Sequence, residues 1–227
     1  MRIFDLGERL GACASYVREG ARVADIGTDH AFLPIWLVKK GICSAAIASD
    51  INELPAKKAA DNVEKYKVGD KVKVFTSDGL EKIAPNEVDD VIIAGMGAEV
   101  ITDIIERAKW LCDGKYRLIL QPMSRVEHLR KYLFDNGFEI LDEKIVCEGG
   151  RVYIVACAQY VGETKNYTTF DIYAGSLADK KDKNSEFLLK KQIKVLQNKA
   201  KAFGEDDPEY KDLIETADRI RNLLDEK

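Results

Sequence analysis

The chain has few of the features that mark membrane, secreted or metal-binding proteins. No apolar run in its 227 residues approaches the length that crosses a bilayer, and the N-terminus lacks the apolar core of a signal peptide. Two histidines far apart and five cysteines without a Cys-x-x-Cys pair argue against a zinc site. We therefore predict a cytoplasmic protein with no metal ion and no membrane partner. Its cysteines are expected to be reduced packing residues in the core, namely Cys13, Cys43, Cys112, Cys147 and Cys157.

Neither sign of charge dominates the chain. Its 35 basic and 39 acidic residues give a formal net charge of −4, so nucleic-acid binding would require a local basic surface. A length of 227 residues allows one substantial core and a smaller appendage. We predict a main domain over residues 1–162 and an extension over residues 163–227.

Strand-like and helical segments alternate along the first part of the chain. Strands are expected at residues 22–25, 44–49, 71–75, 88–94 and 117–121. Helices are expected at residues 6–17, 32–40, 53–67, 99–111 and 126–136. Two further strands, 138–147 and 151–160, are predicted to form a hairpin. This order predicts an α/β fold, a doubly wound Rossmann-like sheet that is mostly parallel with one antiparallel strand.

The end of the chain has a different pattern. Apolar residues recur at alternating spacings of four and three over residues 189–203 and again over residues 210–224. Gly204 is expected to stop the first helix, and Asp206 or Asp207 to cap the second ahead of Pro208. We predict a C-terminal antiparallel helical hairpin with a coiled-coil-like seam.

Carboxylates and glycines follow the first three predicted strands, at the edge where such sheets bind ligands. Asp25 and Gly27 follow the first strand, Asp50 the second, and Asp78 with Gly79 the third. S-adenosylmethionine carries an ammonium group, ribose hydroxyls and an adenine amine, and a carboxylate accepts hydrogen bonds from all of these. Each aspartate alone is an ordinary turn residue. The three together predict a site for this cofactor, with its amino-acid end at Asp25, its ribose at Asp50 and its adenine at Asp78.

A dinucleotide is the competing ligand, because an acidic residue after the second strand is expected there as well. Dinucleotide loops have three spaced glycines, whereas this chain has Gly27-Thr28-Asp29-His30-Ala31. Asp29 would also repel a pyrophosphate at the start of the helix. The loop therefore favours S-adenosylmethionine, which has no phosphate.

Several segments together resemble the bacterial tRNA (adenine-22-N1)-methyltransferase family. They are VADIGTDHAFLP, ASDIN, SDGL, IIAGMGAE, LQPMSRVEHLRKYLFDNGFEI and EGGRVYIV. The resemblance covers the whole chain and implies a class I methyltransferase that transfers a methyl group from S-adenosylmethionine to N1 of adenine 22 in tRNA. One departure is Ala98, since the family usually has a further glycine after Gly-Met-Gly.

The resemblance also implies site residues. The expected cofactor contacts are Asp25, Gly27, Asp50, Asn52, Asp78 and Gly79, to which we add Gly95 and the adjoining His30 and Ile51. The residues expected to border the methyl group and the target base are Gly95, Met96 and Gly97.

Methyl transfer to adenine N1 needs no strong general base, because N1 attacks through its lone pair. The predicted task of the site is to hold the reactants in line and to exclude water. His30 is next to the cofactor loop, but a lone histidine there is more often structural than a base. Asp29 is the candidate for balancing the positive product. Gln121 either hydrogen-bonds the target base or ends its strand, and the sequence leaves both interpretations open.

Eight lysines but only two acidic residues lie between residues 180 and 201. Such a helix either follows phosphates or is a solvated face. The resemblance favours RNA, with Lys190, Lys191 and Lys194 as expected contacts. The chain is expected to be a monomer, with a dimer through the hairpin left open.

Two other functions stay open from the sequence. A methyltransferase of small molecules or proteins would share the cofactor site but would show no salt-sensitive RNA binding. A non-catalytic interaction module would show no saturable cofactor binding.

Overall fold

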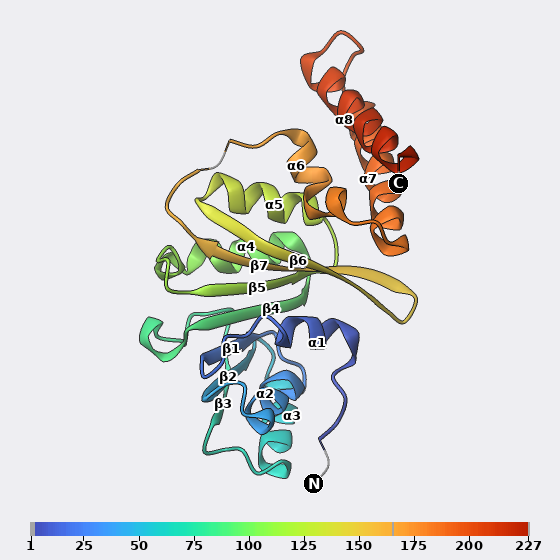
Figure 1. The fold of residues 1–227 in the computed structure, drawn as a ribbon. Helices are drawn as coiled ribbons and strands as arrows, with labels where there is room; N and C mark the ends of the chain where they lie inside the picture. Colours follow the sequence, from blue (N-terminus) through green and yellow to red (C-terminus); the bar gives the residue numbers. More distant parts are fainter. Residues whose placement is uncertain (1–2, 165, 227) are drawn as a thin grey trace. The chain divides into compact units, whose positions relative to one another are not determined.

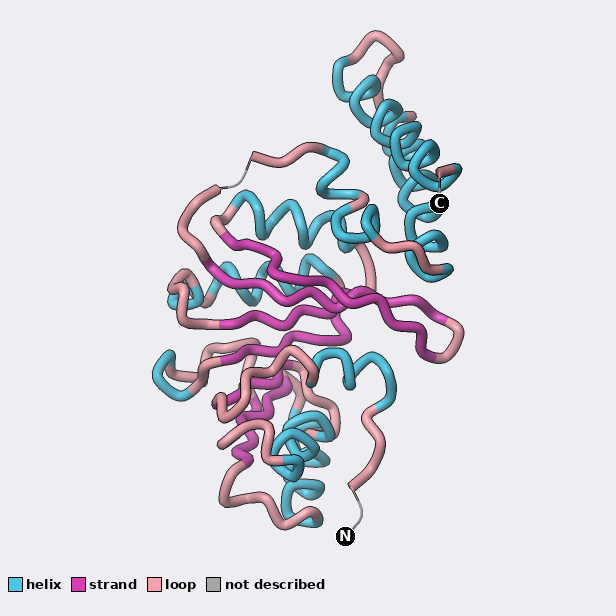
Figure 2. The backbone as a smooth tube through the Cα atoms, in the orientation of Figure 1, coloured by secondary structure: helices cyan, strands magenta, loops and turns pink. Residues whose placement is uncertain are grey.

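The computed structural model describes residues 3–164 and 166–226 and divides the chain into two units, Met1–Thr164 and Lys165–Lys227. The described part of the first unit contains a seven-stranded sheet covered by helices (Figure 1). The second unit is helical (Figure 2).

The strand order of the sheet is β3-β2-β1-β4-β5-β7-β6. The strands are β1 (Arg22–Ile26), β2 (Ala45–Asp50), β3 (Val72–Thr76), β4 (Asp90–Met96), β5 (Arg117–Pro122), β6 (Phe138–Glu148) and β7 (Arg151–Tyr160). Neighbouring strands are parallel from β3 to β5, while β7 runs antiparallel to both β5 and β6. The predicted doubly wound sheet with one antiparallel strand is confirmed.

Helices cover both faces of the sheet, as Figure 1 shows. One face carries α1 (Gly7–Ala14), α2 (Phe32–Lys40) and α3 (Glu53–Lys65), and the other carries α4 (Ala98–Arg107) and α5 (Val126–Asp135). Short 3-10 helices lie at Pro85–Glu87 and Lys109–Leu111. Because both faces are covered, the middle of a central strand is apolar on both sides, as at residues 91–93 of β4 and 118–120 of β5. Val23 packs into one core and its neighbour Ala24 into the other.

The second unit contains α6 (Thr169–Tyr173), a 3-10 turn (Gly175–Asp179), α7 (Lys183–Ala200) and α8 (Pro208–Asp225). Leu189 and Leu196 of α7 and Leu213 and Ile220 of α8 are fully buried along the predicted seam. Of the two predicted caps, Asp207 is the one used, since its carboxylate accepts a hydrogen bond from the backbone N–H of residue 209 at 2.8 Å. The predicted helical hairpin is present.

Three helices end three or four residues earlier than predicted, with α1 ending at Ala14, α4 at Arg107 and α7 at Ala200. The chain then continues in tight turns whose N–H groups donate to the carbonyl three residues back. Val17 N donates to Ala14 O at 3.2 Å, and Phe203 N donates to Ala200 O at 3.0 Å. Residues three apart lie on the same face of an α-helix and of a 3-10 turn. The spacing of apolar residues therefore does not show where the helix ends and the turn begins.

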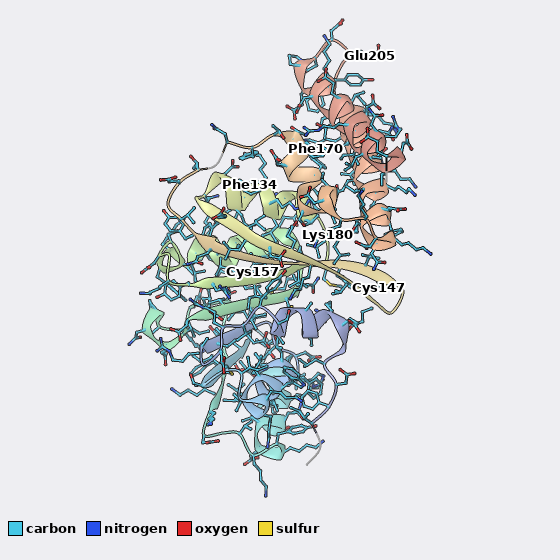
Figure 3. All side chains as sticks on the ribbon, viewed as in Figure 1. Phe134, Cys147, Cys157, Phe170, Lys180 and Glu205 are labelled. Carbon is cyan, nitrogen blue, oxygen red and sulfur yellow. The ribbon has the colours of Figure 1, made fainter. Side chains whose placement is uncertain are left out.

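The prediction that all five cysteines are buried is wrong for Cys112 and Cys147, which are exposed. Figure 3 labels Cys147 near the tip of the β6–β7 hairpin and Cys157 within the sheet. Residues 144–148 of β6 pair with residues 151–155 of β7, beyond the stretch of β7 that pairs with β5. A two-stranded ribbon leaves side chains open to water, and this explains the exposure of Cys147.

Candidate functional site

The carboxyl ends of β1, β2 and β4, the loops that follow β1, β2 and β3, and helix α4 border one cavity of about 650 Å³. Parallel strands end at the same edge of the sheet, and this brings together loops far apart in sequence. The volume falls within the roughly 300–1,000 Å³ of small-ligand sites. The predicted residues that line the cavity are Gly27, Asp50, Ile51, Asn52, Asp78, Gly79, Gly95 and Met96.

Gly27 forms the turn after β1 and has a φ of +77°. Its N–H and that of Thr28 both donate to Ser49 O, at 2.8 and 2.9 Å, which ties the turn to the end of β2. A Cβ atom at this position would overlap Met96 Cε. The backbone conformation therefore favours glycine, and a side chain here would also have to displace the end of Met96.

Asp25 is buried on β1, behind the described lining of the cavity. Burial raises the pKa of its carboxyl to about 6, although the Thr28 hydroxyl bonds to it and Arg9 supplies a nearby positive charge. Both partners favour the ionised form but do not offset the loss of water. The carboxylate therefore keeps an incompletely compensated negative charge next to the Gly27 turn.

Asp50 lies at the end of β2. Its Oδ1 accepts hydrogen bonds from Asn52 N at 2.8 Å and from Asn52 Nδ2 at 3.3 Å. Among the described residues, nothing donates to Asp50 Oδ2. The free oxygen suits a diol, because hydroxyl groups donate to carboxylates.

Asp78 follows β3 and is held by Arg107 of α4. The two guanidinium nitrogens donate to the two carboxylate oxygens at 3.0 Å each. These bonds hold the pKa of the Asp78 carboxyl below its usual value. Arg107 also pairs with Glu81 at 3.1 Å and with Asp103 at 3.0 Å. Each Asp78 oxygen keeps a second lone pair, which an exocyclic amine can use.

Several residues that line the cavity were not among the predicted ones, namely Ile26, Ser77, Ala94, Val100, Asp103, Ile104 and Arg107. Ile51 and Val100 are exposed apolar residues there, 61% and 51% accessible, and offer aliphatic surface to a flat ring. In the sequence, the usable signal for such a wall was the position of these apolar residues, directly after the second strand and in the first turn of the helix that follows the fourth. The only local hint of Arg107 was its spacing of four from Asp103 on α4.

Other predicted site residues lie outside the described lining of the cavity: Asp25, Asp29, His30, Gly97 and Gln121. His30 Nε2 is 3.0 Å from Asp29 Oδ2, and the His30 ring stacks on Phe32 with 5.2 Å between centroids. Asp29 keeps 64% of its side chain exposed. Gly97 is the residue before α4.

Gln121 is fully buried at the end of β5. Its Oε1 accepts from Arg9 Nη1 at 2.7 Å and from Gly95 N at 3.1 Å, and its Nε2 donates to Pro122 O at 2.8 Å. With these polar atoms engaged inside the protein, the geometry favours a supporting role over direct contact with a base.

Among residues 3–164 and 166–226, no helix has the length and apolar character to cross a membrane. No three His, Cys, Asp or Glu side chains of this part of the chain are grouped so as to hold a metal ion.

The chain is similar to known proteins along its whole length. A family model described as a methyltransferase domain matches residues 6–156. The tRNA (adenine(22)-N(1))-methyltransferase of Bacillus subtilis is 36% identical over 228 residues, which cover 99% of this chain and 95% of that enzyme. A Streptococcus pneumoniae protein solved with S-adenosyl-L-methionine is 31% identical with a TM-score of 0.83, over 97% of this chain and 100% of that one. An M. capricolum relative solved with S-adenosyl-homocysteine is 26% identical with a TM-score of 0.79, over 99% of both chains.

Proposed function

The chain belongs to the bacterial tRNA (adenine(22)-N(1))-methyltransferase family of class I methyltransferases, and from this premise we propose that it methylates N1 of adenine 22 in tRNA with S-adenosylmethionine as the donor. The observation that carries the proposal is the meeting of Gly27, Asp50, Asp78 and Gly95 around one cavity. These residues come from the ends of four strands or the turns after them. The two aspartates supply acceptors, and the two glycines allow the backbone to approach the cofactor closely.

Each part of the cofactor has a group to hold it in this site. Asp25 and the Gly27 turn would hold the amino-acid end, and Asp50 Oδ2 the ribose hydroxyls. Asp78 would accept from the adenine amine, while Ile51 flanks the ring. When bound, S-adenosylmethionine supplies an electrophilic methyl group on its sulfonium.

The residues of the chain orient the base and exclude water, because adenine N1 has no proton to lose before it attacks. Gly95 and Met96 lie at the edge of the cavity, where the base would enter. A base stacked in folded tRNA must first be extruded, at a cost of a few kcal/mol. Asp29, with its exposed carboxylate, would balance the positive charge of the methylated base.

Contact with tRNA is assigned to the exposed lysines of α7, Lys190, Lys191 and Lys194. A tRNA substrate also implies a cytoplasmic enzyme. The monomer is the proposed working state, and pairing of two copies through α7 and α8 is the alternative.

The proposal is tested by incubating the protein with labelled S-adenosylmethionine and an unmodified tRNA transcript, followed by nucleoside analysis. The matched control is the same transcript with guanine in place of adenine 22. We expect 1-methyladenosine from the first transcript only. Its absence with a correctly folded substrate, or its appearance in both transcripts, would overturn the assignment.

A further inference from the structure

One large apolar side chain of the helical hairpin is left on its surface. Phe187 of α7 is 58% accessible, and among residues 166–226 no other large apolar side chain is exposed. The helices α7 and α8 lie side by side (Figure 1), and Leu189 of α7 is fully buried in their seam. Two residues along a helix are about 200° apart around its axis. Phe187 therefore points away from the seam that buries Leu189.

Lysines surround Phe187 on the same face of α7. Residues three, four and seven apart along a helix share a face. Four exposed lysines stand at these spacings from Phe187, namely Lys183, Lys190, Lys191 and Lys194. Of these four, only Lys190 has an acidic side chain within ion-pair distance in the described part of the chain, Glu186 at 3.8 Å. The exposed face of α7 is thus a basic stripe with an aromatic ring in its middle.

An aromatic ring within a basic stripe suits a nucleic acid with an unpaired base. Lysines neutralise phosphates, and a ring can stack on the face of any base that is free of its neighbours. A duplex offers no such face inside the helix, because its bases are stacked on one another. A protein interface is the other use of an exposed aromatic residue, but the core of such an interface is depleted of lysine. The lysines on both sides of Phe187 along α7 therefore favour RNA.

We propose that Phe187 stacks on an unpaired base of the tRNA while the neighbouring lysines bind the phosphates beside that base. The inference rests on the proposed function and deepens it, because it gives α7 a preference for a loop of the folded tRNA over a duplex. Phosphate contacts alone carry no such preference, since they are the same along any RNA strand. Stacking is also a contact between uncharged groups, so salt does not screen it.

Filter binding over a salt series separates the ring from the charges. Phe187→Ala should weaken tRNA binding about tenfold at every salt concentration. It should leave the slope of log affinity against log salt unchanged, because no charge is lost. Phe187→Trp should keep the affinity of the wild-type protein, whereas Phe187→Leu, which is apolar but has no ring, should lose it as Phe187→Ala does. Leu141→Ala removes another exposed apolar side chain, on β6, and is the control that should change neither quantity.

A second ligand, a fully paired RNA duplex, tests whether an unpaired base is recognised. Phe187→Ala should bind the duplex as tightly as the wild-type protein does, because the lysines that hold its phosphates are still present. In Phe187→Trp the new indole reports the contact directly, since stacking on a base quenches its fluorescence. Measured against the wild-type protein, which has two tryptophans of its own, this fluorescence should fall with tRNA and stay unchanged with the duplex.

The outcomes separate this inference from the proposed function. If Phe187→Ala weakens tRNA and duplex equally, or neither, stacking by Phe187 is overturned while methylation of adenine 22 stands. If the variant keeps its tRNA affinity but shifts from dimer to monomer in sedimentation, the ring joins two copies of the chain, and the inference is overturned as well. A wild-type protein that neither binds nor methylates tRNA would overturn the proposed function itself. Thermal unfolding of each variant establishes that it is folded.

Discussion

At Gly27, the backbone conformation of the turn and the shape of the cavity both depend on the absence of a side chain. Replacing it by alanine places a side chain at a φ of +77° and displaces Met96 Cε. The left-handed backbone costs about 1–2 kcal/mol. The end of the Met96 side chain is flexible, so it can move aside and the fold is kept. We expect the displaced side chain to enter the space that the ligand occupies. Gly27→Ala should therefore weaken S-adenosylhomocysteine binding about tenfold, or 1.4 kcal/mol, in calorimetry.

Gly41 provides a matched control for the backbone strain at Gly27. Its φ is +71° and nothing lies within 4 Å of a Cβ atom built there. Gly41→Ala should lower the free energy of unfolding by a similar amount without affecting ligand affinity. If the two variants bind the ligand equally well, the Gly27 turn is not part of the site. Partial recovery of affinity in Gly27→Ala with Met96→Ala would identify Met96 as the obstructing group.

Asp25 makes stability depend on pH in a predictable direction. Burial raises the pKa of its carboxyl from 3.8 to about 6, so between these values the folded chain binds more protons than the unfolded chain. The free energy of unfolding therefore falls as pH rises through this window and levels off above it. Between about pH 4.5 and 7 the contribution lost is about 2 kcal/mol. Asp25→Asn should remove this slope in urea unfolding experiments.

Asp89 is the control, because its pKa is shifted in the opposite direction from that of Asp25. Its hydrogen bonds from Arg22 lower the pKa of its carboxyl to about 2, so its stabilising contribution is lost only as pH falls below about 4. Asp89→Asn should therefore leave the slope between about pH 4.5 and 7 in place. Parallel pH profiles for Asp25→Asn and the wild-type protein would show that burial does not perturb Asp25.

At the scale of elements, the sequence predicts those segments whose ends are marked locally. The helix Phe32–Lys40 has the predicted bounds because Gly41 ends it in a left-handed conformation. The strand Arg151–Tyr160 also has the predicted bounds. The aspartates at the strand ends could be placed in one crevice for the same reason, since the order of strands and helices fixes which loops meet.

Pairings between distant elements have no comparable mark in the sequence. Arg130 on α5 is fully buried and donates to Glu143 of β6 at 2.9 and 3.0 Å, although charged residues are usually expected at the surface. Arg107 with Asp78, and Arg9 with Gln121, are of the same kind. Each pair joins a helix to another element, so its existence depends on the tertiary fold. Of the residues that line the cavity, Gly27, Asp50, Asp78, Gly79 and Gly95 were therefore predictable from the sequence, whereas Asp103 and Arg107 were not.

At the scale of the whole molecule, the cofactor and the methyl acceptor are identified from different observations. The cavity residues suit a ligand with hydroxyl and amine groups, and none of them distinguishes tRNA from another acceptor. The acceptor is identified by the similarity to the Bacillus subtilis enzyme, which extends over 99% of this chain. A chain with a net charge of −4 must then meet an anionic RNA through a local basic surface.

The lysines of α7 are the proposed surface, and salt dependence tests them directly. Each lysine that neutralises a phosphate contributes about 0.7 to 0.9 to the slope of log affinity against log salt, the values for single strands and for duplex DNA. Replacing Lys190, Lys191 and Lys194 by alanine should therefore lower tRNA affinity at low salt and reduce that slope by about 2 to 3. Filter binding over a salt series measures both quantities.

The control for this prediction removes the same charge at the opposite edge of the sheet from the cavity. Lys71, Lys73 and Lys115 are exposed near the amino ends of β3 and β5, so their replacement by alanine changes net charge equally without touching α7. If both triple variants lose the same affinity and slope, binding follows overall charge rather than α7. If neither variant changes, α7 and α8 serve another purpose, such as pairing two copies. A loss confined to the α7 variant locates the RNA on that helix, because salt screens the attraction between the phosphates and any exposed charge farther away than about a Debye length.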